Sequence, residues 1–206
     1  PSLHRTELAE RVDGNGCCPY GKWCGARLWL RRSALPAFIG MLPPSYIGAD
    51  VAAAAGIKPD IVLTPGKPAP LPDASVDTIL STQVLEHVYD FKSYLADCNR
   101  LLRPGGRMIL SAPMHWRHHE TPYDYWRFTR FGLWKSMEDS GFGILDFRPC
   151  GGFFAMLGQA FMDYRNEKGK RGKFTASIIN RIFLWLDGRL ADTDDMLGWM
   201  GIVEKL

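Results

Sequence analysis

Residues 46–113 alternate between short apolar runs and one amphipathic run, and this alternation constrains the fold more than any other feature. Apolar runs at Tyr46–Val51, Val76–Ser81 and Arg107–Ala112 predict strands. Between residues 84 and 102 the apolar side chains recur at helical spacing, which predicts a helix. Strands that alternate with helices in this way are typical of an open α/β sheet with helices on both faces.

The rest of the chain extends this pattern to a Rossmann-like sheet that is mostly parallel, has an antiparallel last strand and leaves the first strand uncertain. The further predicted elements are a strand at Ile61–Leu63, a helix from Thr129 to Ser140, a strand at Ile144–Phe147, helices over 152–165 and 174–190, and a strand at Leu197–Lys205. We expect residues 1–44 to form an irregular or frameshifted segment. Residues 45–206 would form one domain, in which 151–196 is a helical insertion or cap.

Length and composition exclude several classes of protein. The net charge of +3 is too small to indicate nucleic acid, and no apolar run reaches the roughly 20 residues that cross a bilayer. No signal peptide is indicated, and the odd count of five cysteines then favours reduced thiols in a cytoplasm. Cys17, Cys18 and Cys24 do not have a common zinc spacing, so we assign no metal site.

Polar residues stand where two of the predicted strands end. Ligands of open α/β sheets bind beyond the carboxyl ends of the strands. Asp50 ends one strand, and its carboxylate can accept two hydrogen bonds from a ribose diol, although a surface aspartate is the simpler reading of that residue alone. Gln83 follows another strand and offers a donor and an acceptor. Glu86 and His87 fit a local role in the first helical turn as well as a chemical role.

Three motifs occur here in a familiar order: Tyr46-Ile-Gly-Ala-Asp50, Gln83-Val-Leu-Glu86-His87-Val and Leu101-Leu-Arg-Pro-Gly-Gly106. Together they resemble the class I S-adenosylmethionine (SAM)-dependent methyltransferases, in the methyltransferase type 11-like branch. The resemblance implies SAM as the cofactor. The residues that it places beside the cofactor are Asp50, Ser81, Thr82 and Gln83.

The segment from His115 to Thr129 is dense in histidines and aromatic residues and follows a predicted strand, as a substrate pocket wall would. A similar run occurs in the resembling branch. The candidates for catalysis are His119, Tyr123 and Asp124, and His118 is a further candidate for a general base that deprotonates the methyl acceptor. A zinc site made from neighbouring residues of this loop would have poor tetrahedral geometry. The plainer reading makes Trp126 and Phe128 core residues and pairs Arg127 with an acidic neighbour.

The glycine-rich turn that this family places after its first strand does not occur before Tyr46. Only glycines let the backbone approach such a cofactor closely. If the codons for Gly25–Arg32 are read starting one base later, the shifted triplets can encode Val-Leu-Asp-Tyr-Gly-Cys-Gly, which is the family's glycine motif. Trp29 followed by Leu30 must give glycine in that frame, because tryptophan has a single codon. We therefore hypothesise a frameshift over roughly 21–42 and expect weak SAM binding.

The resemblance implies a SAM-dependent methyltransferase that acts on a small-molecule or a glycan- or lipid-linked acceptor. The alternative is a non-catalytic, methyltransferase-like binding module, which the missing turn favours. A dinucleotide oxidoreductase would need Gly-x-Gly-x-x-Gly upstream, and the chain has no such run. The two apolar helices over 152–165 and 174–190 fit burial best, with peripheral membrane contact beside the basic turn 165–173 as the alternative.

Overall fold

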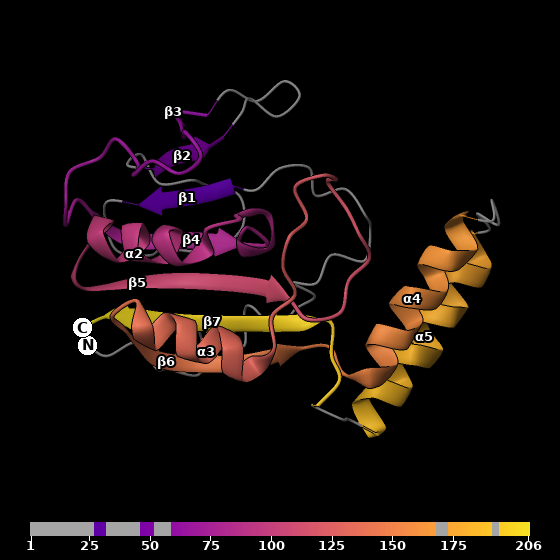
Figure 1. The fold of residues 1–206 in the computed structure, drawn as a ribbon. Helices are drawn as coiled ribbons and strands as arrows, with labels where there is room; N and C mark the ends of the chain where they lie inside the picture. The colour runs from indigo at the N-terminus through magenta and orange to yellow at the C-terminus, as the bar shows by residue number, and fades with distance from the viewer. Residues whose placement is uncertain (1–26, 32–45, 52–58, 168–172, 191–193) are drawn as a thin grey trace.

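The computed structural model describes residues 27–31, 46–51, 59–167, 173–190 and 194–206. These residues form a seven-stranded sheet in the order β3-β2-β1-β4-β5-β7-β6 (Figure 1). The strands are β1 (Arg27–Arg31), β2 (Tyr46–Asp50), β3 (Ile61–Val62), β4 (Val76–Thr82), β5 (Leu102–Pro113), β6 (Phe142–Cys150) and β7 (Gly198–Lys205). The helical segments are η1 (Leu85–His87), α2 (Phe91–Leu101), α3 (Arg130–Asp139), α4 (Phe153–Glu167) and α5 (Lys173–Arg189).

The strands β2, β3, β4, β5 and β6 point in one direction, and β7 runs antiparallel to both of its neighbours. The mostly parallel α/β sheet with an antiparallel last strand is therefore confirmed. β1 fills the place between β2 and β4, but it runs antiparallel to both. Its first residue, Arg27, pairs with Thr82, and its last, Arg31, pairs with Thr78. The rest of the segment 21–42, with its proposed frameshift, and the cysteines at 17, 18 and 24 lie outside the described residues.

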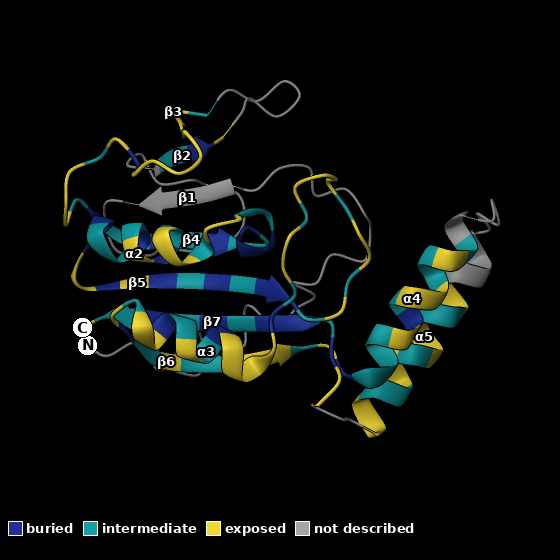
Figure 2. Ribbon diagram, in the orientation of Figure 1, coloured by how far each residue is buried: buried dark blue, intermediate teal, exposed yellow. Residues whose placement is uncertain are grey.

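The core lies between the sheet and the helices α2 and α3, which cover the same face of the sheet (Figure 1). In Figure 2 the buried colour recurs along β5 and covers the first part of β7. The side chains below 2% exposure include Ile79, Leu95, Leu101, Met108, Leu110, Leu133, Met137 and Phe142. Apolar burial on this scale is the main stabilising contribution in a domain of this size. It fixes β4 and β5, and hence the ends of these strands.

The predicted helix over 84–102 is wrong in its first turns. The chain forms the short η1, passes through an extended residue at Val88, and begins α2 only at Phe91. The cause is a cap, because the Asp90 side chain accepts a hydrogen bond from the backbone N–H of Ser93. The predicted cap of the next helix is confirmed, since Thr129 accepts from Gly132 at the start of α3.

Helices α4 and α5 pack against each other and leave the sheet beyond the ends of β6 and β7 (Figure 1). Asp187 of α5 holds the start of α4, accepting from the backbone N–H groups of Gly152 and Ala155. The two helices approach closely at Gly158, where an added Cβ would lie 2.9 Å from the Phe183 side chain. Among the described helices, none is long and apolar enough to span a membrane.

Candidate functional site at the carboxyl edge of the sheet

Asp50 ends β2 and Gln83 directly follows β4, two strands that run in the same direction with β1 between them, so both residues stand at the carboxyl edge of the sheet. Asp50 is 8% exposed, and its Oδ1 accepts from the N–H of Val51 at 2.7 Å. Gln83 has a positive φ of 53°. Its backbone N–H donates to the Ser111 carbonyl at 3.0 Å, and its Nε2 donates to the Ser111 hydroxyl at 3.1 Å. These contacts fix Gln83 between β4 and β5.

Ser81 and Thr82, the other residues predicted beside a cofactor, have different environments. Ser81 is fully buried, and its hydroxyl shares a 2.8 Å hydrogen bond with the Tyr94 hydroxyl of α2. Its side chain therefore belongs to the layer between sheet and helix. Thr82 is half-buried at the end of β4. Because successive side chains of a strand point to opposite faces, Thr82 faces away from that layer.

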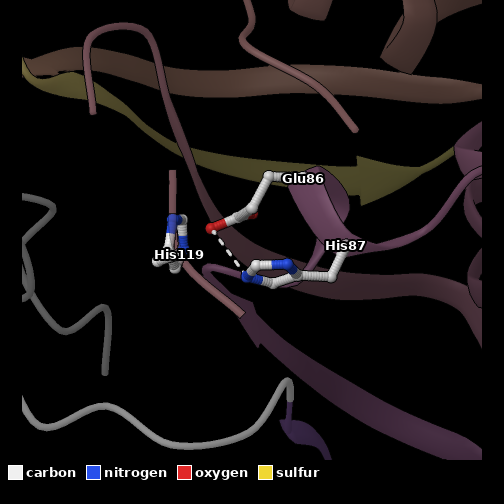
Figure 3. A group of neighbouring side chains, drawn as sticks. All are labelled: Glu86, His87 and His119. Carbon is white, nitrogen blue, oxygen red and sulfur yellow. Dashed lines mark ion pairs between the residues drawn. The ribbon is translucent and has the colours of Figure 1, made fainter. Parts of the chain in front are cut away.

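A carboxylate and two imidazoles meet just beyond this edge. Glu86 and His87 belong to η1, and His119 belongs to the loop 115–129 between β5 and α3. Figure 3 shows their side chains turned toward one another. Glu86 Oε1 lies 3.9 Å from His87 Nε2, and the two imidazole rings meet edge to face with centroids 4.7 Å apart. Glu86 is fully buried, and among the described residues neither of its carboxylate oxygens has a hydrogen-bond partner. Burial raises the pKa of Glu86 to about 8.

Asp124 holds the loop together. Its side chain is 2% exposed and pairs with Arg127 through two short contacts, of 2.6 and 2.8 Å. It also accepts from the backbone N–H of His119 at 3.1 Å. Burial alone would raise the pKa of Asp124, but the hydrogen bonds from Arg127 and His119 outweigh it and hold that pKa well below its ordinary range. Asp124 is thus an ionised positioning residue, and the predicted pairing of Arg127 with an acidic neighbour is confirmed.

The same loop is tied to η1 by its main chain. The backbone N–H groups of Tyr125 and Trp126 both donate to the carbonyl oxygen of Glu86, at 2.8 and 3.2 Å. At the end of the loop, the Phe128 N–H donates to the Pro113 carbonyl at 2.8 Å. These main-chain hydrogen bonds therefore hold the loop beside the buried carboxylate, and the Glu86 side chain takes no part in them.

The aromatic residues of the loop divide into a buried and an exposed set. Phe128 is buried, as predicted, and its carbonyl accepts from the Trp199 indole at 3.0 Å. Trp126 is 36% exposed and forms a surface group with Tyr89 and Tyr125, in which the Tyr89 ring meets Tyr125 edge to face. Exposed aromatic faces next to polar groups suit the binding of a ring-containing ligand.

The loop histidines do not converge on one point. His115 contacts Asp195 at 3.3 Å, and His118 is largely exposed and contacts Asp124. Only His119 joins Glu86 and His87, while Tyr123 offers its carbonyl to His87 Nδ1 at 2.8 Å and leaves its ring exposed. Sequence reasoning left Glu86 open because helical periodicity gives no sign that a loop more than 25 residues further along the chain buries it.

Comparison with known proteins locates the family signal in the same part of the chain. The family model described as "Methyltransferase domain" matches residues 44–110. The match covers β2 to the middle of β5 and includes the residues Asp50, Gln83 and Glu86. The position of the expected glycine turn and the loop 115–129 lie outside it.

Two curated relatives match shorter segments of this chain. A Mycolicibacterium smegmatis protein described as a probable S-adenosylmethionine-dependent methyltransferase is 50% identical over 44 residues, 21% of this chain and 17% of that protein. The demethylmenaquinone methyltransferase of Tropheryma whipplei is 37% identical over 54 residues, 26% of this chain and 23% of the relative. The chain thus matches less than a quarter of the length of either relative.

One solved structure with a likeness to this chain is a SAM-dependent methyltransferase from Mesorhizobium loti. Its TM-score is 0.45 at 17% identity, with 76% of this chain and 78% of the other covered. A likeness of this extent is not evidence for a shared activity.

Proposed function

We propose that the chain is part of a SAM-dependent methyltransferase that transfers a methyl group to a small-molecule or a glycan- or lipid-linked acceptor. The observation that carries the proposal is the methyltransferase-domain match over residues 44–110, together with the polar groups at the carboxyl edge inside that match. The named relatives support SAM as the cofactor. The cytoplasmic location predicted from the sequence stays a prediction.

In this proposal Asp50 and Gln83 contact the cofactor. A carboxylate at the end of the second strand of such a sheet suits a ribose diol. Thr82 lies next to this place, whereas the Ser81 hydroxyl is engaged with Tyr94 and contributes to packing.

Methyl transfer needs the acceptor atom in line with the sulfonium methyl group, and a base if the acceptor carries a proton. Glu86, His87 and His119 form the group that can receive this proton, because they are titratable and converge at the edge. Tyr123, with an exposed ring, is the candidate for acceptor contact, and Asp124 positions His119 through its backbone.

The α4–α5 hairpin supports a lipid-linked acceptor. Exposed apolar residues recur at helical spacing on each helix: Leu157, Phe161 and Tyr164 on α4, and Ile178, Ile182 and Trp185 on α5. The guanidinium of Arg189 lies 4.6 Å from the centre of the Trp185 ring, and Arg181 is exposed beside it. Apolar and aromatic residues flanked by arginine suit the surface of an anionic bilayer. The hairpin leaves the sheet at the edge that carries the site (Figure 1).

The reversed direction of β1 favours the second candidate, a non-catalytic binding module. In an antiparallel β1, the residue at the carboxyl edge is Arg27, and Arg31 lies at the opposite edge of the sheet. A turn that follows this strand cannot then contact a cofactor at the carboxyl edge. We therefore expect the present chain to bind SAM weakly.

Calorimetric titration with SAM tests both candidates. The chain would be compared with a variant in which Gly25–Arg31 is replaced by Val-Leu-Asp-Tyr-Gly-Cys-Gly. We expect binding at least about tenfold tighter in the replaced chain, and loss of that gain with Asp50→Asn but not with Asp139→Asn on the exposed side of α3. Labelled SAM that crosslinks to neither chain would favour the binding module and contradict the enzyme proposal.

A further inference from the structure

The cluster of Glu86, His87 and His119 has the composition of a metal site. Each residue offers one ligand atom, and these three atoms all lie within 4.8 Å of one another (Figure 3). Two imidazoles and one carboxylate are a common ligand set for zinc in catalytic sites and for non-haem iron. The ligands come from two segments that the main-chain bonds to the Glu86 carbonyl hold side by side.

The hydrogen bonds of the two imidazoles leave the ring nitrogens that a metal needs. His87 Nδ1 lies 2.8 Å from the Tyr123 carbonyl, and His119 Nδ1 lies 3.0 Å from the Arg117 carbonyl. A carbonyl only accepts, so both Nδ1 atoms carry a hydrogen, and in the neutral form of each ring the Nε2 atom has the lone pair that a metal ion needs. An Nδ1–H bound to a backbone carbonyl is the usual outer contact of a metal-binding histidine, because it orients the ring.

Glu86 provides the independent sign of a missing partner. Its side chain is fully buried, and within the part of the chain that the structure describes both carboxylate oxygens lack a hydrogen-bond partner. Buried polar groups are nearly always partnered, so a native orphan carboxylate needs an explanation. The nearest cationic candidate, His87, has its Nε2 3.9 Å from Glu86 Oε1, which is too far for a hydrogen bond.

The distances fit an ion better than direct contact between the side chains. Glu86 Oε1 and Glu120 Oε2 lie 3.9 and 3.8 Å from His87 Nε2. A zinc ion about 2.1 Å from each ligand atom keeps these atoms about 3.4 Å apart in a tetrahedron. Small side-chain rotations would shorten the distances between the ligand atoms to those of a tetrahedral zinc site.

We propose that Glu86, His87 and His119 bind a divalent transition-metal ion. Among such ions, Zn²⁺ fits this set of two imidazoles and one carboxylate best. The sequence alone assigned no metal ligands. The site contains His119, which the sequence predicted as a catalytic candidate. It also contains Glu86 and His87, for which the sequence did not decide between a structural and a chemical role. Three protein ligands leave at least one position for water or an acceptor oxygen. If the methyltransferase proposal holds, the ion would polarise the acceptor oxygen there, which removes the need for His119 to act as a base.

Metal titration of the full chain tests the site without any activity assay. Co²⁺ would be followed by its visible absorption and Zn²⁺ by competition, and His119→Gln would be compared with His118→Gln as a matched control. His118 is adjacent in sequence, but its side chain is 89% exposed and lies outside the cluster. We expect one ion per chain in the wild type and in His118→Gln. Affinity should fall at least about a hundredfold in His119→Gln and in Glu86→Gln.

Circular dichroism and thermal melts of each variant separate loss of the site from loss of the fold. A thiolate-to-cobalt charge-transfer band would assign the ion to the cysteines and overturn the proposal. Equal affinity of the wild type and a folded His119→Gln, or no binding by the wild type, would overturn it as well. Because no outcome depends on SAM, the metal site and the methyltransferase proposal fail independently.

Discussion

Replacing Glu86 by glutamine should remove a specific pH dependence of stability in the metal-free protein. Burial raises the pKa of Glu86 from an ordinary 4.5 to about 8. Between these two values the folded protein keeps a proton that the unfolded chain has released. The contribution of Glu86 is therefore most favourable below pH 4.5 and is lost as pH rises toward 8. Glutamine is neutral throughout and cannot show this loss.

The size of the effect follows from the two pKa values. Each pH unit in the window costs the folded state about 1.4 kcal/mol relative to the unfolded chain. The whole window therefore amounts to about 5 kcal/mol, a large share of the stability of an ordinary domain. Glu86→Gln leaves a buried amide without a partner at every pH, so the prediction concerns the slope and not the absolute stability.

Urea unfolding, followed by tryptophan fluorescence in the presence of a chelator, measures this slope. Between about pH 5 and about pH 8, the wild type should lose about 4 kcal/mol relative to Glu86→Gln. Glu138→Gln, an exposed substitution on α3, should follow the wild type. Parallel curves for the wild type and Glu86→Gln would refute a buried, protonated Glu86. A saturating metal ion should flatten the wild-type curve, because the ligand must then be ionised.

Three further predictions concern the rest of the fold. Trp185→Ser should weaken sedimentation with anionic lipid vesicles several-fold without changing the melting temperature by more than about 2 °C, and equal sedimentation would argue against the bilayer contact. Gly198→Ala should lower the free energy of unfolding by about 3 kcal/mol in urea titrations, because the new Cβ would lie 2.5 Å from the Ala112 carbonyl oxygen. Asp124→Asn should cost about 2 kcal/mol by leaving Arg127 without its carboxylate, with faster hydrogen exchange in the loop, and its difference in stability from the wild type should stay constant above about pH 5.

The order of elements was predictable because the apolar periodicity of this chain reports burial directly. Val76–Thr82 and Gly198–Lys205 form strands close to the predicted bounds, and Thr129 caps α3 as predicted. The break between η1 and α2 was missed because Leu85 is buried in the same core as the helix, so the periodicity continues across it. Asp90 was the available signal, since aspartate favours the position before a helix.

The candidate site was only half accessible to sequence reasoning. Asp50 and Gln83 follow predicted strands, and strand ends are where an open sheet binds ligands. The meeting of Glu86 with His119 depends on the path of a loop that hydrogen bonds between distant segments determine. The direction of β1 was likewise beyond prediction, because a strand pattern does not specify which way a strand runs between two parallel-directed neighbours.

The backbone N–H groups of Tyr125 and Trp126 donate to the Glu86 carbonyl, so the position of the loop does not depend on the side chain at residue 86. Every amino acid has a backbone carbonyl, so any residue at position 86 would keep these two hydrogen bonds to the loop. The identity of the side chain at that position sets the charge beside His87 and His119, while the peptide bond sets where the loop lies. Related sequences could therefore change the chemistry at this position by a single substitution and inherit the loop geometry unaltered.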